Sequence, residues 1–201
     1  MKTVIYTQRV EVIEVYRERR DCADQRIADF ISACGFLPIP VPNRSDLAEG
    51  IIKDMQPAGI ILTGGNSLVR YGGNAPERDA MDSALIDLAI QDHIPLYGFC
   101  RGMQSILAYF GNDLVNVDGH VAVRHTVISE EGSYGVNSYH NQACVKLKDG
   151  CRLLATAKTE DGVIEAIRHE NLPIMGTMWH PEREEIFTGR DIENVRNIMR
   201  V

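Results

Sequence analysis

Residues 95–104 read PLYGFCRGMQ, and this stretch decides the fold. Its first five residues form a short apolar run, as in a strand buried in a parallel sheet, and a helical pattern follows over Gly102–Phe110. Gly98 and Gly102 flank Cys100 at a turn so tight that a side chain at either glycine would collide with neighbouring backbone. The stretch therefore predicts a strand, a sharp turn that carries Cys100, and a helix.

This setting makes Cys100 a candidate nucleophile. The turn lifts the sulfur to the carboxyl end of the sheet, where parallel α/β folds keep their sites. A helix begins beside the thiol, and the partial positive charge at its N-terminus favours the reactive thiolate. Free cysteines are more often small buried hydrophobes. That interpretation holds for the four that lack such a setting, Cys22, Cys34, Cys144 and Cys151.

Short β-branched runs alternate with helical runs along the chain. Strands are predicted over residues 3–7, 36–41 (at an edge, because of its prolines), 59–62 and 95–99, and helices over 18–34, 45–54, 76–92 and 102–110. The second half has mainly short strands, over residues 115–128, 134–138, 152–157, 163–168 and 174–178, and a last helix over 188–200. This order predicts an α/β fold with a mostly parallel central sheet and helices on both faces. No linker divides the chain, so residues 1–201 are expected to form one domain.

The composition excludes several classes of protein. The 201 residues are 44% apolar and 24% charged, and the formal net charge is −7 with scattered basic residues. A nucleic-acid binder would need a concentrated basic face, and no apolar run is long enough for an export signal or a membrane span. The odd number of cysteines, without CxxC pairs, predicts reduced thiols in a cytoplasmic protein. No Cys or His pair has the spacing of zinc ligands, so no metal site is expected.

A base for the cysteine is predicted near the C-terminus. His180 and Glu182 lie two residues apart just after a predicted strand, so extended backbone directs both side chains to one side. Pro181 restricts His180 to extended geometry. The carboxylate can accept a hydrogen bond from one imidazole nitrogen and leave the other facing the thiol. His180 is therefore the expected base and Glu182 its orienting partner.

Four segments, taken together and in this order, resemble those of class I glutamine amidotransferases and their γ-glutamyl hydrolase relatives. They are Leu62–Gly65, Gly98–Gln104, Val136–His140 and Trp179–Glu182. The resemblance covers nearly the whole chain and implies a flavodoxin-like fold. It also implies hydrolysis of a γ-glutamyl amide through a Cys100 thioester, with no metal or organic cofactor.

The resemblance extends to further site residues. It implies an oxyanion hole made by the backbone N–H groups of Gly65 and Arg101, which the glycines of the first segment allow to approach the substrate closely. The small γ-glutamyl substrate is expected to be held by Gly64, Asn66, Arg70, Gln104, Asn137, Ser138, Tyr139 and His140. For His120, His125 and His140 the sequence indicates no chemistry beyond lining the pocket.

The sequence leaves two functions open, which differ in where the released nitrogen goes. One is a hydrolase that acts alone, and the other is a glutaminase subunit that delivers ammonia to a separate synthase. A non-catalytic relative is disfavoured by the intact set of Cys100, His180 and Glu182. The long polar segment from Asn66 to Asp79 begins at the mouth of the site and favours the hydrolase. Residues 74–79, 136–140 and 178–184 together look most like those of γ-glutamyl-CDP-amidate hydrolases, which serve surface-polysaccharide phosphoramidate synthesis. In this interpretation Arg70 or Arg78 would meet a phosphate of the nucleotide. The oligomeric state is not determined by the sequence.

Overall fold

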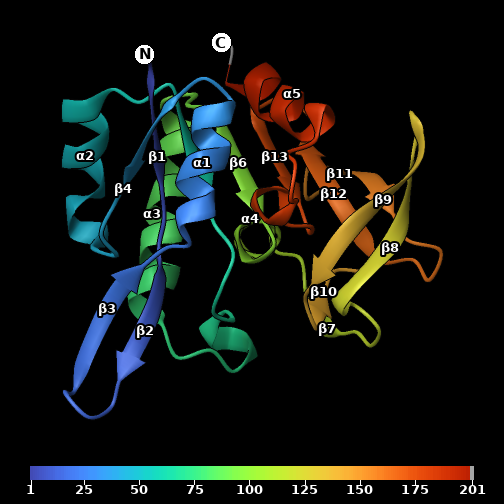
Figure 1. The fold of residues 1–201 in the computed structure, drawn as a ribbon, viewed down its shortest axis with the longest axis horizontal. Coiled ribbons are helices and arrows are strands. Elements are labelled where there is room, and N and C mark those ends of the chain that lie inside the picture. Colours follow the sequence, from blue (N-terminus) through green and yellow to red (C-terminus); the bar gives the residue numbers. More distant parts are fainter. Residues whose placement is uncertain (200–201) are drawn as a thin grey trace.

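A computed structural model describes residues 1–199, and its centre is one nine-stranded sheet (Figure 1). In spatial order the strands are β4 (Leu37–Pro40), β1 (Thr3–Tyr6), β5 (Gly59–Leu62), β6 (Leu96–Phe99), β13 (Ile174–Thr177), β12 (Ile164–His169), β11 (Leu153–Lys158), β8 (Val121–Ser129) and β9 (Gly132–Tyr139). The first five run parallel, and every further neighbouring pair is antiparallel. The predicted edge position of the proline-containing strand is confirmed, because β4 ends the sheet.

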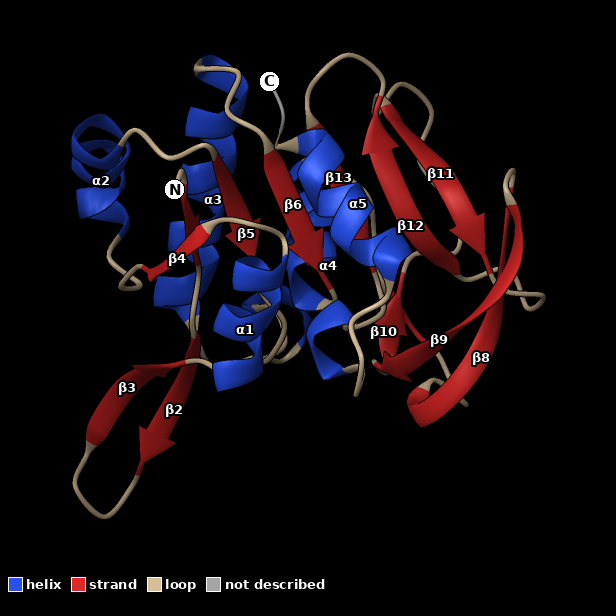
Figure 2. Ribbon diagram, turned by 45° about the horizontal axis from the view of Figure 1, so that its top comes forward, coloured by secondary structure: helices blue, strands red, loops and turns tan. Residues whose placement is uncertain are grey.

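Helices cover both faces of the parallel part, as predicted (Figures 1 and 2). One core packs under α2 (Ala48–Met55), α3 (Pro76–Gln91) and α4 (Arg101–Tyr109), and the other under α1 (Gln25–Ala33) and α5 (Gly189–Ile198). Strand side chains alternate between the two cores: Ile5 belongs to the first, and Val4 and Tyr6 to the second. Within residues 1–199, the helices are all too short or too polar to cross a bilayer.

The prediction of a helix over residues 18–34 is wrong in its first part. Residues Glu18–Cys22 form β3, which pairs with β2 (Arg9–Ile13) in an antiparallel hairpin that projects from the sheet (Figure 2). The charged run looked helical by composition. The alternation of apolar and charged residues in RVEVI is the period of a strand, and it decides the local structure.

The remaining elements are short. They are the strand pair β7 (Val115–Asn116) and β10 (Gln142–Ala143) and the 3₁₀ turns η1 (Ser45–Leu47), η2 (Val69–Tyr71) and η3 (Pro181–Arg183). The last position of the predicted C-terminal helix, residue 200, lies outside the described residues.

The turn between β6 and α4 is as crowded as the sequence predicts. A Cβ built on Gly102 would lie 2.0 Å from the carbonyl oxygen of Leu62, and one on Gly98 would lie 2.6 Å from the carbonyl carbon of Gly102. Cys100 between them has φ 51° and ψ −112°, a conformation that residues with a side chain rarely adopt. The two glycines thus allow α4 to press against β5 while the cysteine is held in a strained turn.

We predict that Gly102→Ala lowers the free energy of unfolding by about 3 kcal/mol or more, because rigid backbone would have to move to admit the methyl group. Gly50→Ala is the matched control, since Gly50 lies in α2 with nothing within 4 Å of its Cβ position. It should be neutral or stabilise by up to about 1 kcal/mol. Urea unfolding measures both, and equal midpoints for Gly102→Ala and the wild type would refute the packing argument.

Candidate active site

Cys100 lies where three elements meet. It follows the last residue of β6 and precedes α4, its backbone N–H donates to the carbonyl oxygen of Thr177 on β13 (2.8 Å), and its own carbonyl accepts from Gln104 (3.0 Å). Its left-handed φ is strain that the neighbouring strands hold in place. The side chain is only 8% exposed. Such a thiol is rigidly aimed and lies at the positive end of a helix.

His180 is fixed by hydrogen bonds on its ring and its backbone. The ring Nδ1 lies 2.6 Å from Oε1 of Glu182, and both side chains are buried. The amide of Asn137 on β9 donates to the His180 carbonyl (2.8 Å) and accepts from its N–H (2.9 Å). The rings of Phe99 and Tyr139 meet the imidazole edge-on at 5.7 and 5.5 Å between centroids. The Glu182 carboxylate therefore sets the tautomer and orientation of the ring.

The charges around His180 stabilise its protonated form. Burial lowers the pKa of His180, but the nearby Cys100 sulfur and the Glu182 carboxylate, which is hydrogen-bonded to Nδ1, outweigh burial and raise this pKa to about 10. At neutral pH the ring therefore carries a proton between a sulfur and a carboxylate. A thiolate with a neighbouring imidazolium can attack a carbonyl carbon and then protonate the leaving group.

The glycine turn after β5 is held from behind by one arginine. The guanidinium of Arg78, a residue of α3 that is 0% exposed, donates to the carbonyl oxygens of Thr63 (2.7 Å), Gly64 (2.9 Å) and Gly65. Burial and the nearby Arg101 lower the pKa of Arg78 to about 9, so it stays protonated at neutral pH. One buried cation thus orients three consecutive peptide groups.

This orientation exposes a backbone donor. All peptide bonds among the described residues are trans, so a carbonyl and the N–H of the next residue point in opposite directions. Because Arg78 holds the Gly64 carbonyl, the N–H of Gly65 points away from Arg78. A Cβ on Gly64 would stand 2.6 Å from Cε1 of His180 and 3.5 Å from Cβ of Cys100, so the turn lies against both side chains.

A second donor comes from the start of α4. The carbonyl of Cys100 points along the helix to Gln104, so the N–H of Arg101 in the same peptide unit points back out of the helix N-terminus. The Arg101 side chain turns inward and is fully buried against Asp79 and Asp82. Arg101 thus offers its backbone to the site, while its side chain anchors α4 to α3.

Residues 20–198 match the family described as Glutamine amidotransferase class-I. The chain belongs to this family. A γ-glutamyl-CDP-amidate hydrolase of Campylobacter jejuni is 33% identical over 185 residues, which cover 89% of this chain and 88% of the relative. The γ-glutamyl-γ-aminobutyrate hydrolase PuuD of Escherichia coli (strain K12) is 30% identical, with 79% of this chain and 77% of the relative covered.

One relative is part of a synthase. The matching subunit of the glutamine-hydrolysing GMP synthase of Methanosphaera stadtmanae is 30% identical, with 79% of this chain and 82% of the relative covered. The crystal structure of a protein described as a GMP synthase subunit, from Thermoplasma acidophilum, superposes with a TM-score of 0.75 over 100% of this chain and 95% of that one, at 21% identity. This confirms the predicted fold. The family and its hydrolysis of C–N bonds, predicted from four segments, are confirmed by the sequence relatives.

Several residues of this class I amidotransferase that are predicted to hold substrate have side chains hydrogen-bonded within the chain. Both ends of the Asn66 amide bond the backbone of Val10, and the Asn137 amide is occupied by His180 and Glu184. The hydroxyl of Ser138 donates to the His120 carbonyl (2.6 Å), and Gln104 donates to the Gln142 carbonyl (2.8 Å). These hydrogen bonds hold the neighbouring backbone in place, and the contacts of these residues with substrate stay a prediction.

The prediction that Arg70 or Arg78 meets a phosphate is contradicted by their positions. The Arg78 guanidinium is enclosed behind the glycine turn. Arg70 pairs with Asp113, which follows the C-terminal end of α4, whereas Cys100 lies at the N-terminal end. His140 is also turned away from the thiol, into a buried group of histidines described below. Tyr139 remains beside the imidazole, with Arg183 stacked 4.3 Å above its ring.

The sequence interpretation missed the hairpin as a wall of the site. A cavity of about 290 Å³ lies beside the glycine turn and is lined in part by Arg9 and Glu11 of β2 and Cys22 of β3. It is lined by Arg9, Glu11, Cys22, Ala23, Asp24, Ile27, Thr63, Gly64, Gly65, Phe99, His180, Glu182 and Arg183. The period-two pattern of RVEVI was the available signal for the hairpin. Nothing local indicated that the base of the hairpin, at Arg9, lies against Gly65.

We predict that Arg78→Met lowers kcat by about 10- to 100-fold with little change in KM, because the glycine turn loses the cation that orients its N–H groups toward a developing oxyanion. Arg70→Met is the matched control and should leave kcat unchanged. Steady-state kinetics of glutamate release would measure both, and a thermal melt would show that the variants are folded. A folded Arg78→Met with kcat within twofold of wild type would exclude this role.

Proposed function

We propose that this chain hydrolyses a γ-glutamyl amide through a Cys100 thioester, with His180 and Glu182 completing a catalytic triad. The observation that supports this most directly is the meeting of three features at one point. A strained cysteine lies at a helix N-terminus, a buried imidazole is paired with a carboxylate at 2.6 Å, and two backbone N–H groups are directed outward by Arg78 and by α4.

In the proposed reaction the Cys100 sulfur attacks the γ-carbonyl carbon, and the carbonyl π electrons move onto oxygen. The N–H groups of Gly65 and Arg101 stabilise this oxyanion. His180 donates its proton to the leaving nitrogen as the C–N bond breaks, which leaves a γ-glutamyl thioester. A water molecule then loses a proton to His180 and attacks the thioester, which releases glutamate and restores the thiolate–imidazolium pair.

We propose that the leaving group is nucleotide-linked, as in γ-glutamyl-CDP-amidate, and that the enzyme serves a surface-polysaccharide phosphoramidate pathway. The relative from Campylobacter jejuni supports this substrate by its name and coverage. The cavity beside the glycine turn is also lined by two arginines, Arg183 and Arg9, of which Arg9 pairs with Glu11 at 2.8 Å. Arginine binds phosphate through parallel charge-assisted hydrogen bonds. Arg9 and Arg183 thus replace Arg70 and Arg78 as the candidates for phosphate contact.

A second candidate function is that of a glutaminase subunit, which would pass ammonia to a separate synthase. The similarity to the GMP synthase of Methanosphaera stadtmanae favours it. The two are separated by incubating the purified chain alone with glutamine, a small γ-glutamyl amide and γ-glutamyl-CDP-amidate, and measuring glutamate. Fast release from the amidate without a partner supports the hydrolase. Glutamate release from glutamine that requires a synthase supports the second function.

The triad proposal predicts graded losses. Cys100→Ala and His180→Asn should each lower kcat/KM by at least about 10⁴-fold, because nucleophile and base act as one unit. Glu182→Gln should cost less, on the order of 10- to 100-fold, since it orients the ring and does not transfer the proton. Glutamate release measures all three. The nucleophile assignment fails if Cys100→Ala stays within tenfold of wild type.

The leaving-group proposal predicts a change in substrate ratio. Arg9→Ala should lower turnover of γ-glutamyl-CDP-amidate by about one to two powers of ten, the loss of one charge-assisted hydrogen bond. It should barely affect a small γ-glutamyl amide that does not extend to β2. Arg20→Ala is the control, because Arg20 lies on the same hairpin, pairs with Glu18 and does not line the cavity. An unchanged ratio in Arg9→Ala would remove this residue from nucleotide recognition.

A further inference from the structure

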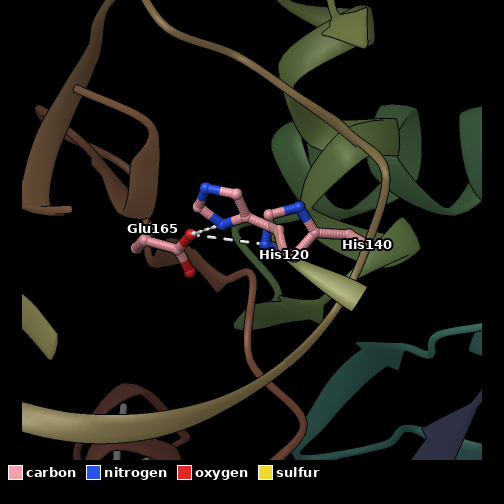
Figure 3. Close-up of side chains that lie close together, drawn as sticks. All are labelled: His120, His140 and Glu165. Carbon is pink, nitrogen blue, oxygen red and sulfur yellow. Dashed lines mark ion pairs between the residues drawn. The ribbon is translucent and has the colours of Figure 1, made fainter. Parts of the chain in front are cut away.

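Three histidines surround one buried glutamate in the antiparallel part of the sheet. His120 immediately precedes β8, His125 lies on β8, His140 immediately follows β9, and Glu165 lies on β12. The side chain of Glu165 is 0% exposed, and those of His120, His140 and His125 are 4%, 1% and 15% exposed. Figure 3 shows the imidazoles of His120 and His140 turned toward the Glu165 carboxylate. The catalytic proposal uses none of these four side chains.

The polar atoms at the centre of this cluster have no hydrogen-bond partner. They are Nδ1 of His120, Nε2 of His125, both ring nitrogens of His140 and both carboxylate oxygens of Glu165. A buried polar atom without a partner costs about 1–3 kcal/mol, and more if it is charged. Five of them, all but Nδ1 of His140, lie in nitrogen–oxygen pairs 3.3–3.5 Å apart around the Glu165 carboxylate, which indicates that another group belongs there.

One of the nitrogens directs a lone pair at the carboxylate whenever its ring is neutral. Nε2 of His120 lies 2.9 Å from Oδ2 of Asp161, which can only accept a hydrogen bond when ionised, so this nitrogen carries the proton. In the neutral ring Nδ1 then presents a lone pair, and it faces Oε1 of Glu165, which also presents lone pairs, at 3.5 Å. Two lone pairs directed at each other repel, unless a cation lies between them.

Three of the four residues, His120, His140 and Glu165, are spaced as ligands of one metal ion, and His125 lies beside them. Nδ1 of His120 and Nε2 of His140 lie 3.5 and 3.3 Å from Oε1 of Glu165, and Nε2 of His125 lies 3.5 Å from Oε2. The ligand atoms of His120, His140 and Glu165 are all within 4.8 Å of one another. Ligands about 2.0–2.1 Å from a tetrahedral zinc ion are about 3.3–3.4 Å apart, so a movement of the His125 ring toward the other three residues would complete the shell.

We propose that this cluster is a binding site for one divalent transition-metal ion, zinc first among them, with three imidazole nitrogens and one carboxylate oxygen as ligands. Imidazole is the nitrogen ligand that zinc, copper, iron and nickel prefer, and the absence of sulfur in this set disfavours copper(I). Asp161 is the outer partner that orients His120, an arrangement typical of zinc-bound histidine. Four protein ligands in a buried place make this a structural site.

The ion would join segments that carry catalytic neighbours. Tyr139 precedes the ligand His140 and packs on the ring of His180. The backbone carbonyl of the ligand Glu165 accepts from Met178 (2.7 Å), two residues before His180. The hydroxyl of Ser138 bonds the carbonyl of His120. The metal would thus fix the edge of the sheet against which the imidazole is positioned, without touching substrate.

The alternative is a metal-free network in which one or more histidines are protonated around Glu165. The two predict different behaviour toward metals. The test uses the full chain expressed in medium with zinc, and its Cys100→Ala variant, which excludes zinc on the catalytic thiol. After removal of loose ions, elemental analysis should find about one zinc per chain in both, and chelator at elevated temperature should lower the melting temperature.

Variants localise the ion. His140→Ala and His125→Ala should lose bound zinc and the effect of chelator on melting. Asp161→Asn should keep the ligands but bind zinc about 10- to 100-fold more weakly. His93→Asn is the control, since His93 is exposed and far along the chain from the cluster, and it should retain a full equivalent. Cobalt substitution should give the visible bands of a four-coordinate ion without a thiolate charge-transfer band.

The proposal is overturned if the Cys100→Ala protein retains no zinc, cobalt, nickel, iron or manganese and its melting is unaffected by any of them, which would establish the protonated network. It is equally overturned if His140→Ala and His125→Ala keep a full equivalent of metal. Neither outcome depends on the activity toward γ-glutamyl substrates, so the metal site and the proposed function can fail separately.

Discussion

The close contact between the start of α4 and the end of β5 is the constraint on which the site depends. Gly102 has no side chain, so its backbone rests against the carbonyl of Leu62, where any Cβ would stand 2.0 Å from that oxygen. Leu62 is the last residue of β5 before the glycine turn, and Cys100 is two residues before Gly102. The contact therefore places the thiol beside the glycine turn, whose N–H at Gly65 we propose to stabilise the substrate's oxyanion. Because parallel strands share their carboxyl ends, β13 brings His180 to the same place.

The buried, charged side chains of Arg78 and Arg101 stabilise this arrangement. Arg78 orients the glycine turn, and Arg101 ties the first turn of α4 to Asp82 on α3. Each cation removed from water would be costly alone, but each is surrounded by carbonyl or carboxylate oxygens. The charges thus act on the two backbone donors from the side opposite to the substrate. Their value lies in orientation, which preorganised catalysis requires.

The antiparallel half of the sheet holds the imidazole of His180 in position. Asn137 on β9 binds both backbone groups of His180, and β12 pairs with β13 just before it. The histidines around Glu165 lie within these same strands or directly beside them. A metal there would stiffen the part of the sheet that lacks the helices covering the parallel part (Figure 1). Catalysis and structural support would then share one set of strands, with different side chains for each.

The sequence by itself determined the local structural features of this protein. Periodicity and residue type suffice to predict features that depend on neighbours in the chain. These are the tight turn around Cys100, the His180–Glu182 spacing and the alternation of strands and helices. The tertiary structure alone decided which distant groups meet. Arg78 acts on carbonyls 13 to 15 residues away, and the base of the hairpin lies beside the glycine turn. His120, His125 and His140 meet Glu165 of β12 from within or directly beside β8 and β9. No spacing rule covers such contacts, because sheet pairing brings the residues together.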